Sequence, residues 1–514
     1  MALDIAIVVI YLVSMLAFGF WGKTRTKNSK DFLVAGRRLG PGFYTGTMAA
    51  VVLGGASTVG GVGLGYKFGI SGMWLVVAIA VGLLLLSLLF APAIQRIKVY
   101  TVAQMLQLRY GINGTQASGI VMAAYTLMLV VVSTTAYATI FQVLFGTERW
   151  LSIAIGALIV IVYSSIGGMW SITLTDMVQF IIKTVGVFFL LLPFAWTQAG
   201  GYDGIIERLG EKVGLSHFDP MAIGFDTIVT YFVIFTFGML IGQDIWQRVF
   251  TARSPQVARW GGTAAGIYCM LYGVAGALIG TAAAALLPDL LTSESASKDD
   301  VFAAVAEHVL PQGLSGIVLA AAVAAMMSTA SGALIACATV ARADVAPLLK
   351  RLAGKGDDHS HDIGQGNPEH DIRANQIYIA ILGVVATLIA LVLSDVVAAL
   401  TVAYDVLVGG LLVAILGGLV WKRANGTGAV ASMIVGAVVT LASMGVYAAI
   451  AGDLLDGIYA NEPIYWGLLS SAVVYVVVSL ATKPTPADVL ENWEQRKAGN
   501  FDEETGAVVV PMGH

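Results

Sequence analysis

One apolar segment of the chain, residues 314–341, carries hydroxyl side chains with the spacing of a cation site. Ala325, Ser328 and Thr329 stand at positions i, i+3 and i+4, so they share one face of a helix. This face offers two hydroxyls and a main-chain carbonyl, and a hard cation such as sodium takes oxygen ligands. Hydroxyls in membrane helices also bond their own i−4 carbonyl or a neighbouring helix, so the cluster alone leaves both interpretations open.

A second apolar segment, residues 50–66, contains six glycines together with Ser57 and Thr58. Glycine costs a helix interior about 1 kcal/mol relative to alanine, so we expect the helix to break here. Broken backbone at membrane depth persists only where protein or a wet cavity satisfies its amides and carbonyls, and such helices form ion and solute sites in transporters. Free carbonyls from this segment would complete an oxygen cage around sodium. Close helix packing through small residues is the alternative.

Charged residues within or beside the apolar segments are further candidates. A carboxylate at the centre of a membrane helix costs about 2.5–3.5 kcal/mol, so we expect Asp176 to have a function. Lys183, seven residues later on the same helix face, would otherwise form a structural ion pair with it. Asp244 and Arg248 approach the cytoplasmic end of another segment and predict an ion pair or gate there. Asp405 is predicted either to gate or to bond nearby backbone.

The elements that must position these residues are apolar helices. The chain has 514 residues, is 58% hydrophobic and 12% charged, and has a mean hydropathy of +0.83. Apolar runs of about 18 residues or more recur along it, and each can cross a hydrocarbon core of about 30 Å. We therefore predict an all-α polytopic membrane protein. Its thirteen predicted spans are residues 3–22, 42–66, 72–93, 118–145, 151–168, 174–197, 225–246, 260–286, 314–341, 375–394, 397–420, 428–451 and 464–482.

The distribution of basic residues predicts the orientation of the chain. Connections on the side of the first loop hold 22 of the 28 lysines and arginines, and those on the other side hold 5. We therefore expect a multi-pass plasma-membrane protein with its N-terminus outside. Residues 1–482 form one transmembrane domain, and residues 483–514 form a cytoplasmic tail that begins with a short interfacial helix. Interruptions in the second and seventh spans lie five spans apart, as inverted repeats of about 42–197 and 225–420 would require.

Several motifs resemble those of the sodium:solute symporter family. They are FLVAGRRLGPG before the second span, GGAS within it, YSSIGGMWSITLTDMVQ leading into the sixth, AAMMSTAS in the ninth and NGTGAVASMIVG entering the twelfth. The resemblance implies a leucine-transporter fold, with two inverted repeats of five helices, one leading helix and two trailing helices. It also implies a sodium site made of the main-chain carbonyls of Ala56, Val59 and Ala325 and the hydroxyls of Ser328 and Thr329.

The same resemblance bears on a second ion and on the solute. In the family the aspartate at the position of Asp176 matters for sodium, and some members use it with ninth-span hydroxyls to bind a second ion. Ser331 matches that pattern, but Gly332 stands where a further serine is expected. Asp176 and Ser331 therefore contribute either to a second sodium site or to an ion route. A Gln–Arg pair ending the seventh span resembles the choline-type branch, yet Val52 replaces the tryptophan which that branch carries, so no cation–π cage is evident.

We expect a sodium-coupled symporter that imports a small polar organic solute by alternating access. The solute is an amino acid such as proline, a zwitterionic osmolyte or a carboxylate, and Na⁺ is the only cofactor expected. A net charge of −4 argues against nucleic acid, and the six histidines all lie outside the spans, which argues against an enzyme. No protein partner is evident; the lipid bilayer is the expected surrounding. Proton coupling through Asp176 and a transporter-like solute sensor are the alternatives. Candidate solute contacts are Ser57, Thr58, Gly60, Tyr125, Thr134, Phe237 and Gln243.

Overall fold

The computed structural model describes residues 2–111, 118–291, 297–352, 368–393, 395–453, 457–458 and 460–501. Within these residues the chain is almost entirely helical, apart from turns and an isolated β-bridge between Leu39 and Ala252. The long helices are α1 (Ala2–Lys23), α8 (Ser118–Phe145), α9 (Arg149–Thr184), α16 (Pro255–Leu286), α18 (Leu314–Val340), α20 (Pro368–Ala390), α21 (Val396–Val420), α22 (Gly426–Ala451) and α24 (Glu462–Ala481).

Shorter helices and single turns continue or connect the long ones. In the first half of the chain they are α2 (Ser29–Val34), η1 (Ala35–Arg37), α3 (Pro41–Val52), η2 (Ala56–Gly60), α4 (Gly61–Phe68), η3 (Gly69–Met73), α5 (Trp74–Leu85), η4 (Leu86–Phe90), α6 (Ala91–Ile97), α7 (Val102–Tyr110), η6 (Val185–Leu191), α10 (Leu192–Gln198), α11 (Gly201–Leu209) and α12 (Glu211–His217). In the second half they are α13 (Phe225–Tyr231), η7 (Phe232–Thr236), α14 (Phe237–Ile241), α15 (Gln243–Val249), η8 (Lys298–Asp300), α17 (Val301–Val309), η9 (Ala341–Val345), α19 (Ala346–Leu352) and α25 (Ala487–Ala498).

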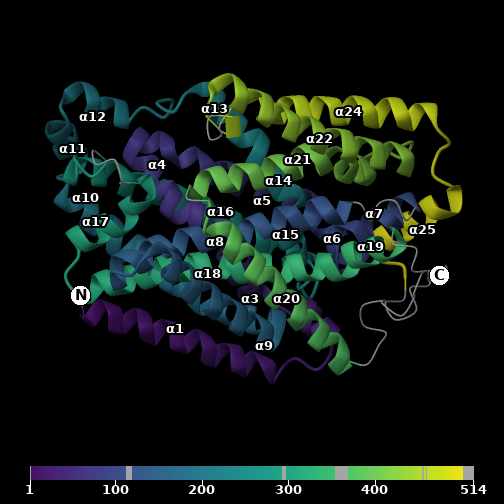
Figure 1. Cartoon of the computed structure of the whole chain (residues 1–514), viewed down its shortest axis with the longest axis horizontal. Coiled ribbons are helices and arrows are strands. Elements are labelled where there is room, and N and C mark those ends of the chain that lie inside the picture. The colour runs from purple at the N-terminus through teal and green to yellow at the C-terminus, as the bar shows by residue number, and fades with distance from the viewer. Residues whose placement is uncertain are drawn as a thin grey trace.

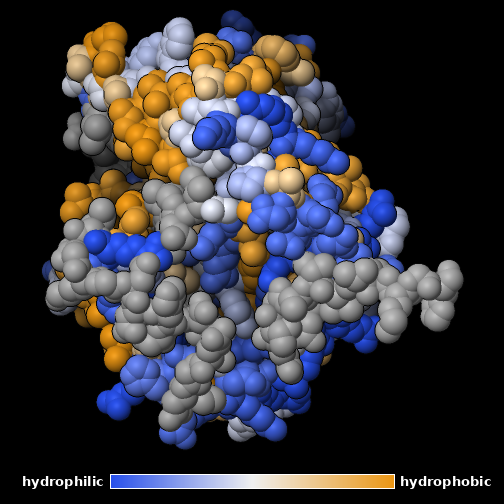
Figure 2. Space-filling view, turned by 90° about the vertical axis from the view of Figure 1, so that its right-hand side faces the viewer, coloured by the Kyte–Doolittle hydropathy of each residue, from blue (hydrophilic) through white to orange (hydrophobic). Residues whose placement is uncertain are grey.

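The long helices lie side by side and run between two ends of the molecule (Figure 1). The end with α11, α12 and α17 lies opposite the end with α7, α19 and α25. Figure 2 looks onto the second end, where hydrophilic residues gather over the centre and hydrophobic residues lie toward the upper edge. The short helix predicted at the start of the tail is present as α25, which packs on α6 and α7 and buries Trp493. Residues 502–514 of the predicted tail lie outside the described part.

The described residues contain ten helical segments that are long and apolar enough to cross a membrane, or eleven if one bent pair counts as a span. This confirms a multi-pass helical membrane protein, whereas the count of thirteen and the repeat layout stay predictions. The segment Arg149–Gln198 joins two predicted spans into 50 residues. A straight helix of that length would measure about 75 Å, more than twice the hydrocarbon core. Gly168, with a φ of 56°, kinks it.

Helix α18 lies at the centre of the bundle, between α8 and α9. Of its apolar window, 94% is buried, whereas only 22% of the window in α20 is buried. Alanine, glycine and serine dominate α18, and small residues let neighbouring helices approach closely. Because α18 presents almost no surface to lipid, its hydroxyl groups must find partners within the protein or on a bound ligand.

Both interruptions predicted from the sequence are present. Helix α3 ends at Val52, and Leu53 leaves the helical conformation with φ −91° and ψ 75° before the π-turn η2 begins. In the seventh predicted span, Gly242 is extended, with φ −61° and ψ 130°, and the helices on either side of it are bent by 47°. A Cβ atom on Gly54 would lie 2.5 Å from Thr329 Oγ1, so glycine is required where the first break meets α18.

Candidate ion and solute site

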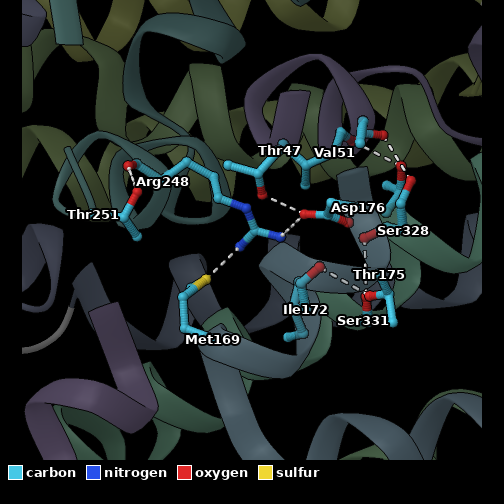
Figure 3. A network of polar contacts seen from close by, with 12 residues as sticks. Thr47, Val51, Met169, Ile172, Thr175, Asp176, Arg248, Thr251, Ser328 and Ser331 are labelled. Carbon is cyan, nitrogen blue, oxygen red and sulfur yellow. Dashed lines mark hydrogen bonds and ion pairs between the residues drawn. The ribbon is translucent and has the colours of Figure 1, made fainter. Parts of the chain in front are cut away.

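The broken end of α3 lies against the hydroxyl face of α18. Ser328 Oγ donates to Ala50 O at 2.7 Å and to Ala325 O at 2.8 Å. Thr329 Oγ1 donates to Val51 O at 2.7 Å and to Ala325 O at 3.4 Å. The last carbonyls of a helix have no amide partner within it, so these hydroxyls satisfy groups that the break has freed (Figure 3). Both hydroxyls therefore connect the two helices while bonding α18 itself.

This arrangement suits a cation in the chemistry of its donor atoms. A hydroxyl has one proton and two lone pairs, so each oxygen that donates to a carbonyl can still accept. Among the predicted ligands, Ala56 and Thr329 line the same cavity. Val59 is buried within η2, and Ala325 O already faces both hydroxyls. π-turns such as η2 often occur at functional sites because they displace backbone groups from regular positions.

The cavity beside the break has a volume of about 30 Å³, which is room for roughly two water molecules. Both broken spans contribute to its wall, together with α5, α8, α18 and α21. The lining residues are Val51, Val52, Gly54, Gly55, Ala56, Ser57, Ile79, Leu129, Val132, Ser133, Met239, Asp244, Ile245, Thr329, Leu400 and Tyr404.

Of the solute contacts predicted from the sequence, only Ser57 is among these lining residues, and its Oγ donates to Val52 O at 3.3 Å. Thr58 Oγ1 bonds Tyr272 Oη of α16 at 3.1 Å. The Gln243 side chain accepts from Val102 N and donates to Tyr100 O, which ties it to the backbone around the start of α7. The remaining predicted contacts that do not line this cavity are Gly60, Tyr125, Thr134 and Phe237.

Helix α8 presents a different face to the cavity from the one that Thr134 occupies. Leu129, Val132 and Ser133 line the cavity, and they follow Tyr125 at helical spacing. The Ser133 hydroxyl is buried and has no hydrogen-bond partner within the described part of the chain, so it can form a hydrogen bond with a solute. Helical spacing from Tyr125 could have identified this face from the sequence. Thr134 lies about 100° further around the helix than Ser133.

Tyr125 supports the cavity wall from behind. Its Oη donates to Asp244 Oδ1 at 3.0 Å, and its ring meets that of Tyr404 edge-on, with centroids 5.3 Å apart. Asp244 and Tyr404 both line the cavity. Asp405, the next residue, is fully buried, and neither carboxylate oxygen has a hydrogen-bond partner within the described part of the chain.

Arg248 forms an ion pair, but its partner differs from the predicted one. Within the described residues it pairs with Asp176 of α9, Nη2 to Oδ2 at 3.3 Å, and not with Asp244. Thr47 of α3 donates to the same Oδ2 atom, and Arg248 Nη1 lies 3.3 Å from Met169 Sδ (Figure 3). Asp244 lies four residues before Arg248 on one short helix, but its carboxylate is engaged with Tyr125.

Lys183 also differs from its predicted role as a partner of Asp176. Its ammonium group donates to Ala50 O at 3.0 Å and to Leu53 O at 3.3 Å. A cation is stabilised at a helix C-terminus, where the carbonyl dipoles concentrate partial negative charge. Lys183 therefore places its ammonium group at the broken end of α3, and it shares the acceptor Ala50 O with Ser328.

A polar contact closes the opposite side of the broken span. Lys298 Nζ bonds Asp395 Oδ2 at 2.7 Å, and Asp299 Oδ2 accepts from Val396 N at 3.3 Å. These contacts tie η8, which packs on α4 and η2, to the start of α21. Burial raises the pKa of Asp299 to about 6, although the neighbouring Lys298 acts in the opposite direction.

A model of the sodium:solute symporter family matches residues 32–436. The chain belongs to this family. Family membership supports sodium-coupled solute symport, and the relatives of this symporter are transporters.

The symporter is 24% identical over 465 residues to the High-affinity choline transporter 1 of Caenorhabditis elegans. The aligned region covers 85% of this chain and 77% of that protein. It is 24% identical over 498 residues to the Osmoregulated proline transporter OpuE of Bacillus subtilis (strain 168), covering 92% and 94%. Against three rodent relatives the chain spans only 31% to 56% of their length. The solved structure of a substrate-bound, outward-open Na⁺-coupled sialic acid symporter shares the fold, with a TM-score of 0.78, 18% identity, and 94% and 98% coverage.

Proposed function

We propose that this symporter uses a sodium gradient to import a small polar organic solute by alternating access. Sodium is the co-transported substrate, and its ligands are the carbonyls of Ala56, Val59 and Ala325 and the hydroxyls of Ser328 and Thr329. The observation that carries the proposal is the break of α3 against the hydroxyl face of α18, in the buried centre of the bundle.

Sodium couples to solute because it joins two elements that move relative to one another. In the described arrangement Ser328 and Thr329 bond the carbonyls of Ala50 and Val51, before the break. A sodium ion on these hydroxyls would instead draw carbonyls of η2, after the break, toward α18. A ligand shifts a conformational equilibrium only as far as it binds one state more tightly than the other. Sodium would bind more tightly to the conformation in which η2 lies close enough to α18 for its carbonyls to reach the ion.

The cavity suits a zwitterion better than a quaternary amine. Asp244 lines it and would receive an ammonium group, while the first amides of η2 would receive a carboxylate. Tyr404 is the one aromatic residue among the described residues that line it, and Val52 stands where the choline-type branch is expected to carry tryptophan. Since about 30 Å³ holds only a few atoms, the solute binds after the wall around Ser57 and Ser133 opens. An amino acid such as proline is the substrate that we favour.

Uptake into proteoliposomes tests this proposal. We expect accumulation of labelled proline, or of another small zwitterion or carboxylate, that requires an inward sodium gradient and fails when choline or lithium replaces sodium. Uptake that follows an imposed pH gradient and ignores sodium would favour proton coupling through Asp176. Solute binding without uptake would favour a sensor. Asp176 is engaged with Arg248 and Thr47, which argues against a freely exchanging proton carrier.

We also propose a plasma-membrane location, with the N-terminus outside and α25 in the cytoplasm. The support is the excess of basic residues on one side of the membrane and the hydrophilic surface at the end that carries α25 (Figure 2). Both native cysteines are buried, so a cysteine introduced for Asn492 can be labelled selectively. We expect a membrane-impermeant maleimide to label it in inside-out vesicles and not in intact cells; the reverse pattern would invert the topology.

A further inference from the structure

The geometry points to Arg248 as a tethered cation that replaces a second coupling ion on Asp176, so that the symporter binds one sodium ion. The inference rests on the proposed sodium coupling and adds its stoichiometry. It concerns a carboxylate that is fully buried beside the proposed sodium ligands and that requires a positive partner. That partner is either an ion taken up in each cycle or a charge belonging to the protein.

The Arg248 guanidinium supplies the charge directly. Its Nη2 atom lies 3.3 Å from Asp176 Oδ2, and neither side chain is exposed. Guanidinium groups stay protonated in proteins, so this charge is permanent. The pair joins α15, after the second break, to α9, and Thr47 on α3 donates to the same carboxylate oxygen. The other oxygen, Oδ1, has no hydrogen-bond partner within the described residues, but a mobile cation bound there would be repelled by the neighbouring guanidinium charge.

The neighbouring hydroxyls are engaged within their own helices. Ser331 Oγ donates to Ser328 O at 3.1 Å. Thr175 Oγ1 donates to Ser171 O at 3.1 Å and to Ile172 O at 2.9 Å (Figure 3). These hydrogen bonds are directed to main-chain carbonyls and not to Asp176, so the carboxylate and the hydroxyls do not form a joint oxygen cage in this arrangement.

Because Gly332 has no side chain, it leaves room for the Arg248 guanidinium to reach Asp176. A Cβ atom on Gly332 would lie 2.7 Å from Arg248 Nη2 and 2.8 Å from Val51 Cγ2. Any larger residue at this position of α18 would push the guanidinium away from the carboxylate. The missing side chain at position 332 thus removes a possible ligand and at the same time admits the arginine.

Sodium binding to the purified full-length protein tests the inference without any solute. Bound ²²Na⁺ is counted by scintillation proximity at alkaline pH, with potassium holding the ionic strength constant. We expect one ion per wild-type chain with a hyperbolic isotherm. Arg248→Gln frees the carboxylate and should bind two ions, Arg248→Lys keeps the tethered charge and should bind one, and the double variant Asp176→Asn with Arg248→Gln should return to one.

The outcomes separate this inference from the proposed function. Two ions on the wild-type chain would overturn the inference and leave sodium coupling intact, whereas none would overturn the proposed function itself. A single ion on a monodisperse Arg248→Gln variant would also refute the tethered-cation role. If that variant does not fold, the number of sodium ions bound by the wild-type protein and by the Arg248→Lys variant still tests the inference. Two bound ions on either of these two proteins would contradict it.

Discussion

Replacing Lys183 by methionine removes the ammonium group at the broken end of α3 while keeping the side chain's length. Lys183 Nζ and Ser328 Oγ bond the same oxygen, at 3.0 Å and 2.7 Å, so the ammonium lies within about 6 Å of Ser328 Oγ. A sodium ion bound to Ser328 Oγ would therefore lie at most about 8 Å from the ammonium, and two unit charges about 6–8 Å apart repel by about 2–3 kcal/mol at an effective dielectric constant of ~20. Since each 1.4 kcal/mol is tenfold, the Lys183→Met variant should bind sodium roughly 10- to 100-fold more tightly.

The same substitution should lower the stability of the sodium-free protein. Leu53 O loses the ammonium donor, and an unsatisfied buried carbonyl costs about 1–3 kcal/mol. Ala50 O keeps Ser328 Oγ as its donor. Thermal unfolding of the purified protein, titrated with sodium against potassium, measures both effects, because sodium that binds only the folded state raises its stability. Lys183→Arg retains the charge and is the matched control. Unchanged or weaker sodium affinity in a folded Lys183→Met variant would refute the electrostatic reasoning.

Three further predictions follow from the cavity, the break and the contact at η8. Ser133→Ala should raise the KM for solute about fivefold, because a neutral hydrogen bond contributes about 1 kcal/mol, whereas Thr134→Val should leave it nearly unchanged. Gly54→Ala should abolish uptake, because its Cβ would lie 2.5 Å from an oxygen on α18, while Gly445→Ala meets nothing within 4 Å and should be tolerated. The pKa of Asp299, about 6, exceeds its unfolded value of about 3.9, so the folded protein should gain stability, up to about 3 kcal/mol, as the pH falls from 7 toward 4.

Each of these predictions has a result that contradicts it. Equal KM values for the two α8 variants would remove Ser133 from the solute site. Normal uptake by Gly54→Ala would mean that α3 and α18 need not approach as closely as described. Asp299→Asn should flatten the rise in unfolding temperature at acidic pH, and an undiminished rise in this variant would assign the effect to another group.

The sequence predicted features that depend on local spacing. The glycines of residues 54–65 predicted the break after α3, and the i, i+3, i+4 spacing predicted that Ser328 and Thr329 share a face. On α8 the solute contact at Thr134 stays a prediction, whereas helical spacing from Tyr125 leads to Ser133, which lines the cavity.

The sequence did not predict which side chains of different helices contact one another. Asp244 and Arg248 are four residues apart, and helical spacing favours such a pair, yet the partner of Arg248 is Asp176 on α9. Nothing local encodes a contact between residues 72 positions apart. The sequence suggested a carboxylate partner for Lys183. The structure shows that it donates to main-chain carbonyls of α3, and the sequence does not reveal these acceptors because it does not show where the chain leaves the helix. The predicted end of a span at residue 168 coincides with the non-helical backbone of Gly168, which separates two helical parts of α9.

The central claim is that sodium is held between the hydroxyl face of α18 and the carbonyls beside the break. The most direct test is ²²Na⁺ binding, without solute, to the double variant Ser328→Ala with Thr329→Val. Ser331→Ala is the matched control, because its hydroxyl donates to a carbonyl of its own helix. We predict that the double variant loses saturable sodium binding while the control keeps the wild-type affinity. Wild-type sodium binding by a folded double variant would contradict the account.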